Sequence, residues 1–396
     1  MIHVGVGHSH DLSTAEAAER ATRTAMGNAG IAKADIAIVF ATINYQTDYE
    51  QLYQAVHANS SCEELIGCTG MSVLTSAGEF EEEPTLAVMV LRGEQLSAVS
   101  FTAQGTASEV GEQIQESIQT ELRDDSLLVI FPDIRAVNPT ELVQHIGSTG
   151  TTIPVVGAAV SGDATGAQMY HWQGTQATEG GVTGLLLTGN FSTEIGVAQG
   201  CQPIGNPREV TKADGHVIFE LDGEPALENF KGALQLLTEE DIRRSGGTVF
   251  VGIAMDDTNK NPTRGDFLIR NLVGINEQHA AIAISEEVKD GQLVQFHLRN
   301  PLAAAEEIQV IIAQLAEKTR DQPPAFGLYF NCLGRGKGLY GTANHDMSII
   351  QEKFPGLPVI GFFGNSEFAP IGGRNFAHAY TGVFVLCSAN YSKVNN

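Results

Sequence analysis

Apolar runs rich in β-branched residues alternate along the chain with amphipathic helical patterns, which is typical of a protein that mixes strands and helices. The first 105 residues predict this order of elements: a strand at 2–7, a helix at 14–28 capped by Thr14, a strand at 36–43, a short helix at 48–58, a strand at 64–68 and a hairpin over 85–105. The hairpin is expected because two alternating runs flank a short turn at Arg92-Gly93-Glu94.

The same order recurs along the chain, with a second hairpin expected over 181–200. A glycine preceded by Ile or Val marks each copy: Gly67, Gly157, Gly274 and Gly361. The pattern predicts four modules of about 90 residues, each α-β-α-β-β-β. We expect an α/β (mixed α+β) fold class, with helices packed on mixed sheets in two pseudo-duplicated domains, because hairpins force antiparallel pairing. The domains are predicted at 1–202 and 203–396, with a Pro-, Gly- and Asp-rich linker over about 203–224.

Charge narrows the range of functions. The chain carries 23 Lys+Arg against 47 Asp+Glu, a net charge of −24. Nucleic-acid binding and attachment to anionic lipid are not expected, because both need clustered cations. Residues 1–200 hold a net −18 and residues 201–396 only −6, so an anion site is expected in the second half. The acidic run Glu79–Glu83 is interpreted as a solvated turn.

The N-terminus, the longest apolar runs and the cysteines indicate the cellular compartment. No secretory leader is recognised at the N-terminus, and no window reaches about 18 continuous apolar residues. The five cysteines are sparse and odd in number, which favours free thiols over a disulfide framework. We therefore expect a cytoplasmic protein that is not anchored in a membrane.

Two polar clusters carry the candidate chemistry. The first follows a predicted strand at residues 329–341 and combines glycines with cations: Asn331, Cys332, Gly334, Arg335 and Gly336. Glycines let backbone N–H groups turn towards an anion, and Arg can grip a carboxylate or phosphate with two hydrogen bonds. The spacing is not that of a P-loop, so nucleotide hydrolysis is not predicted.

The second cluster spans residues 361–382 and places polar groups between strands: Asn365, Ser366, Glu367, Arg374, His378 and Tyr380. Because the clusters follow two neighbouring predicted strands, they are expected to meet at one end of a sheet and to line a ligand pocket. The alternative is a long hairpin whose polar groups bond to one another. By the repeat, the segment 157–166 is the counterpart of this cluster and a candidate for a second pocket.

Other chemistry receives weaker support. Cys332 is a candidate nucleophile, with His378 or His345 as its base, although a buried inert thiol is the simpler interpretation. His8, His10, Cys62 and Cys68 match no common zinc spacing, so no metal is predicted. No cofactor is expected either, because the early Gly5-x-Gly7 lacks the third glycine of a dinucleotide-binding loop.

The chain resembles the FIST family over nearly its whole length. FNCLGRGKGLYG, VIGFFGNSEFAP and GGRNFAHAYTG are similar to the FIST C-terminal domain, and VGVGHS, DIAIVFAT, EELIGCTG and PVVGAAVSGD to the FIST N-terminal domain, of the stand-alone bacterial or archaeal type. The family signature falls on these residues: Cys332, Gly334, Arg335, Gly336, Gly361, Gly364, Asn365, Glu367, Pro370, His378 and Thr381. Ser366 departs from the usual glycine, and the stretch before Ala77-Gly78 is irregular.

The resemblance implies a sensory domain for signal transduction that binds a small ligand, with amino acids as proposed ligands. The carboxylate of such a ligand would contact Arg335 or Arg374, and its amino group would contact Glu367. Output would pass through a signalling partner or through a homo-oligomer. Two alternatives stay open at this point: an enzyme that uses Cys332, and a scaffold that binds another protein.

Overall fold

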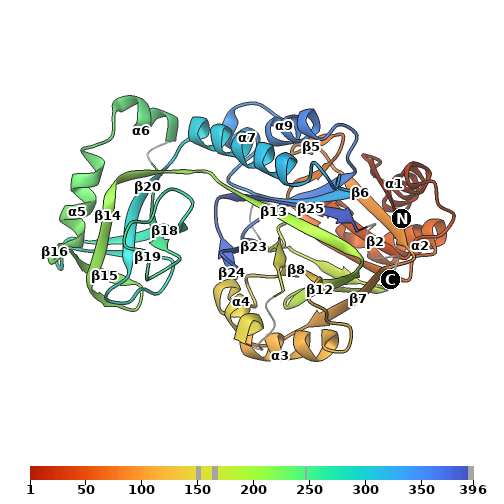
Figure 1. Ribbon diagram of the computed structural model, residues 1–396, viewed down its shortest axis with the longest axis horizontal. Coiled ribbons are helices and arrows are strands. Elements are labelled where there is room, and N and C mark those ends of the chain that lie inside the picture. Colours follow the sequence, from red (N-terminus) through yellow and green to blue (C-terminus); the bar gives the residue numbers. More distant parts are fainter. Residues whose placement is uncertain (149–152, 163–167, 246–247, 391–396) are drawn as a thin grey trace. The chain divides into compact units, whose positions relative to one another are not determined.

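A computed structural model describes residues 1–148, 153–162, 168–245 and 248–390 (Figure 1). Within these ranges the strands form four sheets with helices packed against them, which confirms a mixed α/β fold. The chain divides into two compact units. The larger unit contains residues 1–197, 309–377 and those from 381 onwards, and the smaller unit contains 198–308 with 378–380. The smaller unit is therefore an insertion in the sequence of the larger one.

The helices lie close to where their apolar periodicity placed them. Their bounds are α1 (Thr14–Ala29), the 3₁₀ turn η1 (Ile43–Asp48), α2 (Tyr49–Ser60), α3 (Ala107–Ile118), α4 (Pro139–Ser148), α5 (Ala226–Leu234), α6 (Glu239–Ser245), α7 (Pro301–Lys318), α8 (Lys337–Tyr340) and α9 (His345–Lys353). The predicted cap of α1 is wrong by one residue. Ser13 caps the helix, because its side chain accepts a hydrogen bond from the Glu16 N–H.

Three six-stranded sheets make up the larger unit. The first runs β1 (Ile2–Ser9), β6 (Leu86–Gly93), β2 (Ile36–Thr42), β3 (Glu64–Gly70), β10 (His171–Gln173) and β11 (Gln176–Thr178). The second runs β7 (Leu96–Ala103), β12 (Val182–Gly189), β8 (Leu127–Pro132), β9 (Val155–Ala158), β23 (Glu367–Ile371) and β24 (Arg374–His378). The third runs β13 (Phe191–Gln199), β25 (Thr381–Ala389), β21 (Phe326–Cys332), β22 (Val359–Gly364), β4 (Val73–Thr75) and β5 (Gly78–Phe80).

These three sheets share one order of pairing. In each, two outer strands precede a central parallel pair, and a short hairpin completes the other edge: β2 with β3, β8 with β9, and β21 with β22 are the parallel pairs. The completing hairpin always comes from a distant part of the chain. Hairpin β4–β5 joins β22, β10–β11 joins β3, and β23–β24 joins β9. In each of the three sheets, the strands at one edge thus come from a segment that is distant in the sequence from the central parallel pair.

The predicted hairpins over 85–105 and 181–200 are wrong as pairings. The strands β6 and β7 form where the sequence placed them, but they belong to different sheets, and so do β12 and β13. Alternation of apolar and polar residues reveals which face of a strand is buried and carries no information about its neighbour. The turn at Arg92-Gly93-Glu94 therefore leads from one sheet into the next.

The marker glycines of three predicted modules share one physical role. Gly67, Gly157 and Gly361 each lie opposite a residue of the parallel neighbour strand. A Cβ atom there would lie 1.8 Å from the Val39 carbonyl oxygen, 2.0 Å from that of Ile130 and 1.7 Å from that of Tyr329, respectively. No side chain fits at such distances. Gly274 differs, because its nearest neighbour would be the Ala283 Cβ at 3.7 Å.

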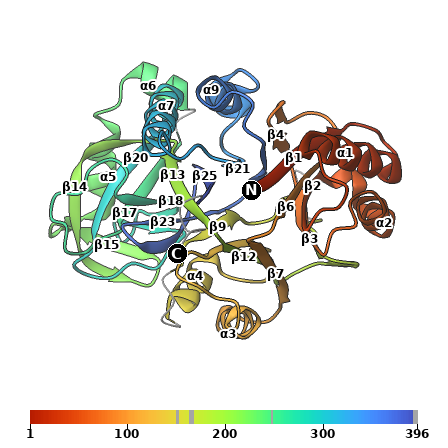
Figure 2. The same ribbon diagram turned by 45° about the vertical axis from the view of Figure 1, so that its right-hand side comes forward.

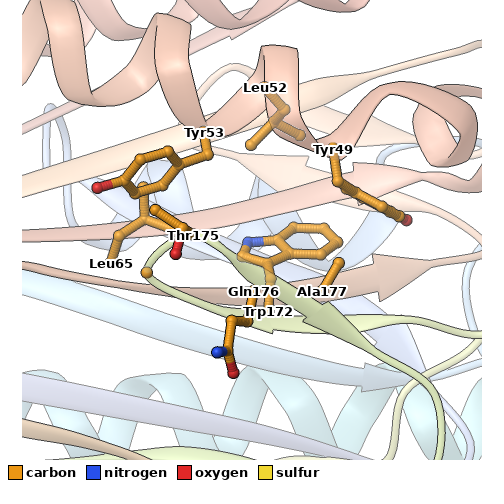
Figure 3. A pocket seen from close by; sticks show the side chains of 9 residues that line it. Tyr49, Leu52, Tyr53, Leu65, Trp172, Thr175, Gln176 and Ala177 are labelled. Atoms are coloured by element: carbon orange, nitrogen blue, oxygen red, sulfur yellow. The ribbon is translucent and has the colours of Figure 1, made fainter.

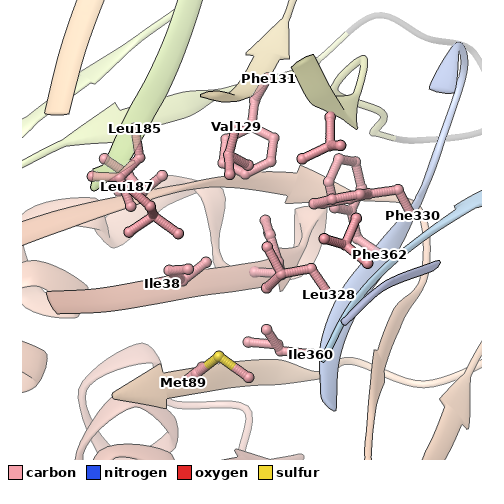
Figure 4. Packing of buried hydrophobic residues seen from close by; sticks show 14 of the residues in the cluster. Ile38, Met89, Val129, Phe131, Leu185, Leu187, Leu328, Phe330, Ile360 and Phe362 are labelled. Carbon is pink, nitrogen blue, oxygen red and sulfur yellow. The ribbon is translucent and has the colours of Figure 1, made fainter. Parts of the chain in front are cut away.

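The three sheets bury a common hydrophobic core (Figure 4). The first sheet contributes Ile38 and Met89, and the second contributes Phe131 and Leu185. The third sheet contributes Leu328, Phe330 and Phe362. Aromatic rings meet there across sheets, with the Phe40 and Phe362 ring centroids 4.8 Å apart. Helices cover the outer faces: α1 and α2 pack on the first sheet, and α3 and α4 lie side by side on the second (Figure 2).

The smaller unit has a different topology. Its strands run β14 (Cys201–Asp214), β20 (Leu293–Arg299), β17 (Val249–Ala254), β18 (Phe267–Asn276), β19 (Ala281–Ile284), β15 (Val217–Leu221) and β16 (Glu224–Pro225). A further pairing of β14 with β15 closes six of these strands into a small barrel. The segment predicted as the third module lies here, in antiparallel pairs such as β17 with β18. The four-module repeat, and the domain boundary near residue 202, stay predictions.

The exchanged hairpins lead to a prediction about the two predicted domains. Residues 1–202 alone would leave β4, β5 and β13 without their partners β21, β22 and β25, and would expose the core faces of the first two sheets. We expect this fragment, expressed by itself, to show no cooperative unfolding transition in urea by circular dichroism. Co-expression with residues 203–396 should restore the transition. A cooperative transition in the isolated fragment would contradict the prediction.

Candidate functional site

The two polar clusters that the sequence singled out meet at one end of the third sheet. β21 ends at Cys332, β22 ends at Gly364, and these residues are register partners in the parallel pair. The Leu333 N–H donates to the Gly364 carbonyl oxygen over 2.9 Å, which ties together the loops that follow the two strands. The structure thereby brings together the predicted site residues that follow both strands: Asn331, Cys332, Asn365, Ser366 and Glu367.

A buried ion pair forms the centre of this site. The side chains of Arg335 and Asp346 are only 1% and 0% exposed, and Arg335 Nη2 lies 3.0 Å from Asp346 Oδ2. Burial alone would raise the pKa of Asp346. Arg335, with hydrogen bonds from His345 and Tyr329, reverses that effect and holds the pKa of this carboxyl well below its usual range. Both groups are therefore charged, and each depends on the other inside the protein.

Further side chains complete the coordination of the ion pair. The Tyr329 hydroxyl donates to Asp346 Oδ2 over 2.7 Å, and Asn331 Nδ2 donates to the same oxygen over 3.3 Å. Arg335 Nη2 also donates to the Tyr340 hydroxyl over 2.7 Å. His345 Nδ1 lies 2.9 Å from Asp346 Oδ1, and its ring stacks on that of Tyr340 at a centroid distance of 3.6 Å. The guanidinium that the sequence assigned to a ligand is thus bonded within the protein.

Asp346 and Glu79 are site residues that sequence reasoning missed. Asp346 shares the buried face of α9 with Ile350, four residues on, and a charged residue at such a position is the signal that could have identified it. Glu79 comes from β5, more than 250 residues away in the sequence, and no local signal indicates its partners. The segment Glu79–Glu83 was predicted to be a solvated turn, which is wrong for the buried Glu79.

The Glu79 carboxyl is only partly satisfied. Its Oε1 accepts a hydrogen bond from the Met347 N–H over 2.9 Å, while its buried Oε2 finds no hydrogen-bond partner among the described residues. Burial, together with repulsion from Asp346, raises the pKa of Glu79 to about 8. The carboxyl is therefore mostly neutral at pH 7 and carries a proton beside the ion pair.

Glu367 presents a second buried carboxyl. It is 0% exposed, and its Oε2 accepts a hydrogen bond from the Thr381 N–H over 3.1 Å. Burial raises the pKa of Glu367 well above its usual range, against the opposing effects of that N–H, the Cys332 side chain and Arg335. Its Oε1 has no hydrogen-bond partner in the described part of the chain. The neighbouring Cys332 thiol is itself buried, at 5% exposure.

The glycine loop holds a carboxylate of the protein itself. The Lys337 N–H donates to both oxygens of Glu81, over 2.9 Å to Oε1 and 3.0 Å to Oε2. Gly336 has φ +62°, and a Cβ there would lie 2.5 Å from Glu81 Oε2. The exposed Glu82 forms an ion pair with Lys337, with Oε1 and Nζ 2.6 Å apart. The expectation that this loop binds the anionic group of a ligand stays a prediction.

The remaining predicted residues are Arg374, His378 and Tyr380. Arg374 is exposed on β24, with its guanidinium carbon 5.3 Å from the centroid of the Phe376 ring. His378 and Tyr380 belong to the smaller unit, where the Tyr380 hydroxyl donates to Asn271 Oδ1 over 2.7 Å. The predicted second pocket at 157–166 includes residues 163–166, which lie outside the described residues.

A separate hollow lies between α2 and the hairpin β10–β11 (Figure 3). Its lining is mainly apolar and aromatic: Tyr49, Leu52, Tyr53, Leu65, Trp172, Gly174, Thr175, Gln176 and Ala177. The cavity volume is about 10 Å³, which is room for about one water molecule. None of the predicted site residues lines it, and its volume has no room for an amino acid.

Two further observations concern membrane spans and metal-binding clusters in the described part of the chain. No helix in the described ranges is both long and apolar enough to cross a membrane. Nor does the described part of the chain contain three His, Cys, Asp or Glu side chains grouped to hold a metal ion. His8 and His10 instead pack against the Phe80 ring, at centroid distances of 4.7 and 5.0 Å.

Comparison with protein families matches residues 35–224 to the FIST N domain and residues 226–370 to the FIST C domain. An uncharacterised protein of Mycobacterium tuberculosis is 30% identical over 387 residues, which cover 97% of this chain and 99% of that protein. An uncharacterised protein of Mycobacterium bovis is 31% identical over 81% of this chain and 82% of its own length. One of Methanocaldococcus jannaschii is 24% identical over 53% of this chain and 42% of its own.

Among solved structures, a cyanuric acid hydrolase from A. caulinodans aligns with 48% of this chain and 71% of its own at 13% identity. The TM-score of 0.26 is too low to establish a shared fold.

The buried ion pair leads to a stability prediction. Replacing Asp346 by Asn keeps the shape of the side chain but leaves the Arg335 charge buried without its counter-ion. We expect Asp346→Asn to lower the free energy of unfolding by about 3–5 kcal/mol in urea titrations. Glu352→Gln, an exposed change on the same helix, is the matched control. A loss no larger than that of the control would show that the pair does not hold the site together.

Glu79 leads to a prediction about pH. Its pKa is about 8 in the folded protein against an ordinary 4.5, so only the unfolded chain is ionised at intermediate pH. The stabilisation from neutral Glu79 is complete below pH 4.5 and is lost as the pH rises through about 8. Glu79→Gln stays neutral, so its stability relative to wild type should rise between pH 5 and pH 8 in urea titrations. If that difference does not change with pH, or changes as it does for Glu352→Gln, the assignment is wrong.

Proposed function

Because the chain belongs to the FIST family, whose domains are generally regarded as sensory and ligand-binding, we propose that it senses a small carboxylate-bearing molecule such as an amino acid. The ligand would bind at the ends of β21 and β22. A signalling partner or self-assembly would then transmit the bound state.

The observation that carries this proposal is unused hydrogen-bonding capacity in a buried polar site. Glu79 Oε2 and Glu367 Oε1 are buried without partners, although a polar atom left unpaired inside a protein costs about 1–3 kcal/mol. Both carboxyls are close enough to Arg335 for its charge to affect their pKa. Clusters of buried ionisable groups with shifted pKa values are typical of functional sites. An ammonium group that enters the site would lower the pKa of these carboxyls, so that their protons leave, and would give the ionised oxygens both a hydrogen-bond donor and a counter-charge.

The enzyme alternative receives less support. A nucleophilic thiol must reach its substrate, whereas Cys332 is 5% exposed. The carboxyl beside it, Glu367, is fully buried, and its Oε2 already accepts a hydrogen bond from the Thr381 N–H. His345 is bonded through Nδ1 to Asp346. This geometry favours a buried thiol that supports the site over a nucleophile that attacks a substrate.

The proposal predicts stabilisation by ligand. Amino acids at millimolar concentration should raise the melting temperature, because a ligand at 100 times its dissociation constant adds about 2.7 kcal/mol. The corresponding amino-acid amides, which lack the carboxylate, should have less effect. Glu367→Gln should weaken the response by removing the counter-charge for the ammonium group, while Glu352→Gln should respond like wild type. If no amino acid or other small acid stabilises the protein, or if Glu367→Gln responds fully, the proposal fails.

A further inference from the structure

We propose that the backbone at Gly336–Lys337 is an exchangeable carboxylate site, that Glu81 is its resident occupant, and that a ligand's carboxylate binds by replacing Glu81. The inference rests on the proposed function, in that it assigns the place of the ligand's carboxylate in the same site. It also names what must move when the ligand enters: residues 81–83 of the acidic strap, which is defined as residues 78–83.

The contact has the geometry of a built carboxylate cradle. One N–H, that of Lys337, serves both oxygens of Glu81 at 2.9 and 3.0 Å. The bare Cα of Gly336 leaves the space that the carboxylate occupies, since a Cβ there would be 2.5 Å from Glu81 Oε2 and 2.8 Å from Phe363 Cε1. Its φ of +62° further restricts the position to glycine. The loop is therefore shaped around a carboxylate.

A second observation, independent of the loop, indicates that this part of the site awaits a ligand. Glu79, two residues before Glu81 in the strap, is 7% exposed and has a buried Oε2 without a partner in the described chain. The two carboxyls are near enough to repel each other. A ligand that carries both an ammonium and a carboxylate would give Glu79 Oε2 a hydrogen-bond donor and would remove the repulsion from Glu81. Its ammonium would lie at Glu79 and its carboxylate at the Lys337 N–H.

Electrostatics make Glu81 a weak occupant of its own site. Its carboxyl is half-buried, and this burial raises its pKa against the opposing effects of the Lys337 N–H and ammonium, while the charges of Glu82 and Asp346 raise it further. The nearby cations are already engaged, because Arg335 pairs with Asp346 and the Lys337 ammonium pairs with Glu82. A zwitterionic ligand brings no net charge, so its exchange for Glu81 removes one negative charge from the crowded cluster.

The strap can release Glu81 without unfolding. Residues 78–80 pair with β4, and the Glu79 N–H donates to Asn344 Oδ1 over 3.1 Å. Glu81 lies just beyond the last residue of β5, in the connection that leads to β6 at Leu86. The hairpin β4–β5 thus stays paired in the third sheet while residues 81–83 move away. Ligand binding is thereby converted into a displacement of a surface segment, which a partner can detect.

The test uses simple carboxylates as probes. Glu81→Ala should leave the cradle vacant, and sodium formate should fill it, giving a saturable rise in melting temperature of about 2 °C or more over sodium chloride at equal ionic strength. Glu83→Ala, from the same acidic run, is the matched control and should respond to formate only as wild type does. Equal responses of the two variants would overturn the proposal.

A second measurement covers the case in which Glu81→Ala does not fold. In Glu81→Gln, formate should shift the backbone amide resonance of Lys337, and wild type should show a much smaller shift at the same concentration. The affinity for an amino acid such as glycine should rise at least about five-fold in Glu81→Gln, because the competing carboxylate is gone. No change at the Lys337 amide in Glu81→Gln would refute the exchange.

The two proposals fail in different ways. If formate binds to the vacant cradle but no amino acid binds to any variant, the carboxylate site is real and the proposed sensory ligand is wrong. If an amino acid stabilises wild type and Glu81→Gln equally and formate has no effect, the ligand binds elsewhere and the exchange is wrong.

Discussion

The larger unit depends on the exchange of hairpins among its three sheets. Each sheet ends in a short hairpin from a distant segment, and each central parallel pair has a glycine opposite its neighbour, which allows the strands to approach. Removing any one segment leaves two sheets incomplete, since the same segment both builds its own sheet and finishes another. All three sheets contribute to one hydrophobic core. The loss of one segment would therefore also expose apolar surface of the other two sheets and lower the free energy of unfolding. Residues from opposite ends of the chain, such as Glu79 and Asp346, can meet only because of this exchange.

The site combines groups that oppose one another electrostatically. Arg335 pairs with Asp346, and what remains are the carboxyls of Glu79 and Glu367, whose pKa values are raised because burial makes their ionised forms unfavourable. A cationic group that enters the site would favour their ionised forms and would supply the counter-charge. The surface cation Lys337 and the strap carboxylates add a second, more exposed layer, in which the Lys337 N–H binds the carboxylate of Glu81.

The positions of many helices and strands, and part of the candidate site, could be predicted from the sequence. The helix α1 and the strand β2 lie close to where the sequence placed them, because burial of one face imposes the helical period on α1 and burial of both faces makes β2 a continuous apolar run. The pairing of strands could not be predicted from the sequence. The strands β6 and β7 show why, because they are neighbours in the sequence but belong to different sheets. Cys332 and Glu367 were expected to converge because adjacent strands end together. Asp346 and Glu79 were missed because a single acidic residue in a helix or in an acidic run does not reveal a partner that only the tertiary fold supplies.

The hairpin β10–β11 carries a feature with a practical consequence. It holds Trp172, the single tryptophan of the chain, and its indole is almost fully buried against β3 and α2. Intrinsic tryptophan emission therefore comes from one known position, on the hairpin that pairs with the distant strand β3. The colour of that emission reports whether the hairpin is docked, and the protein carries its own optical probe of assembly without any label.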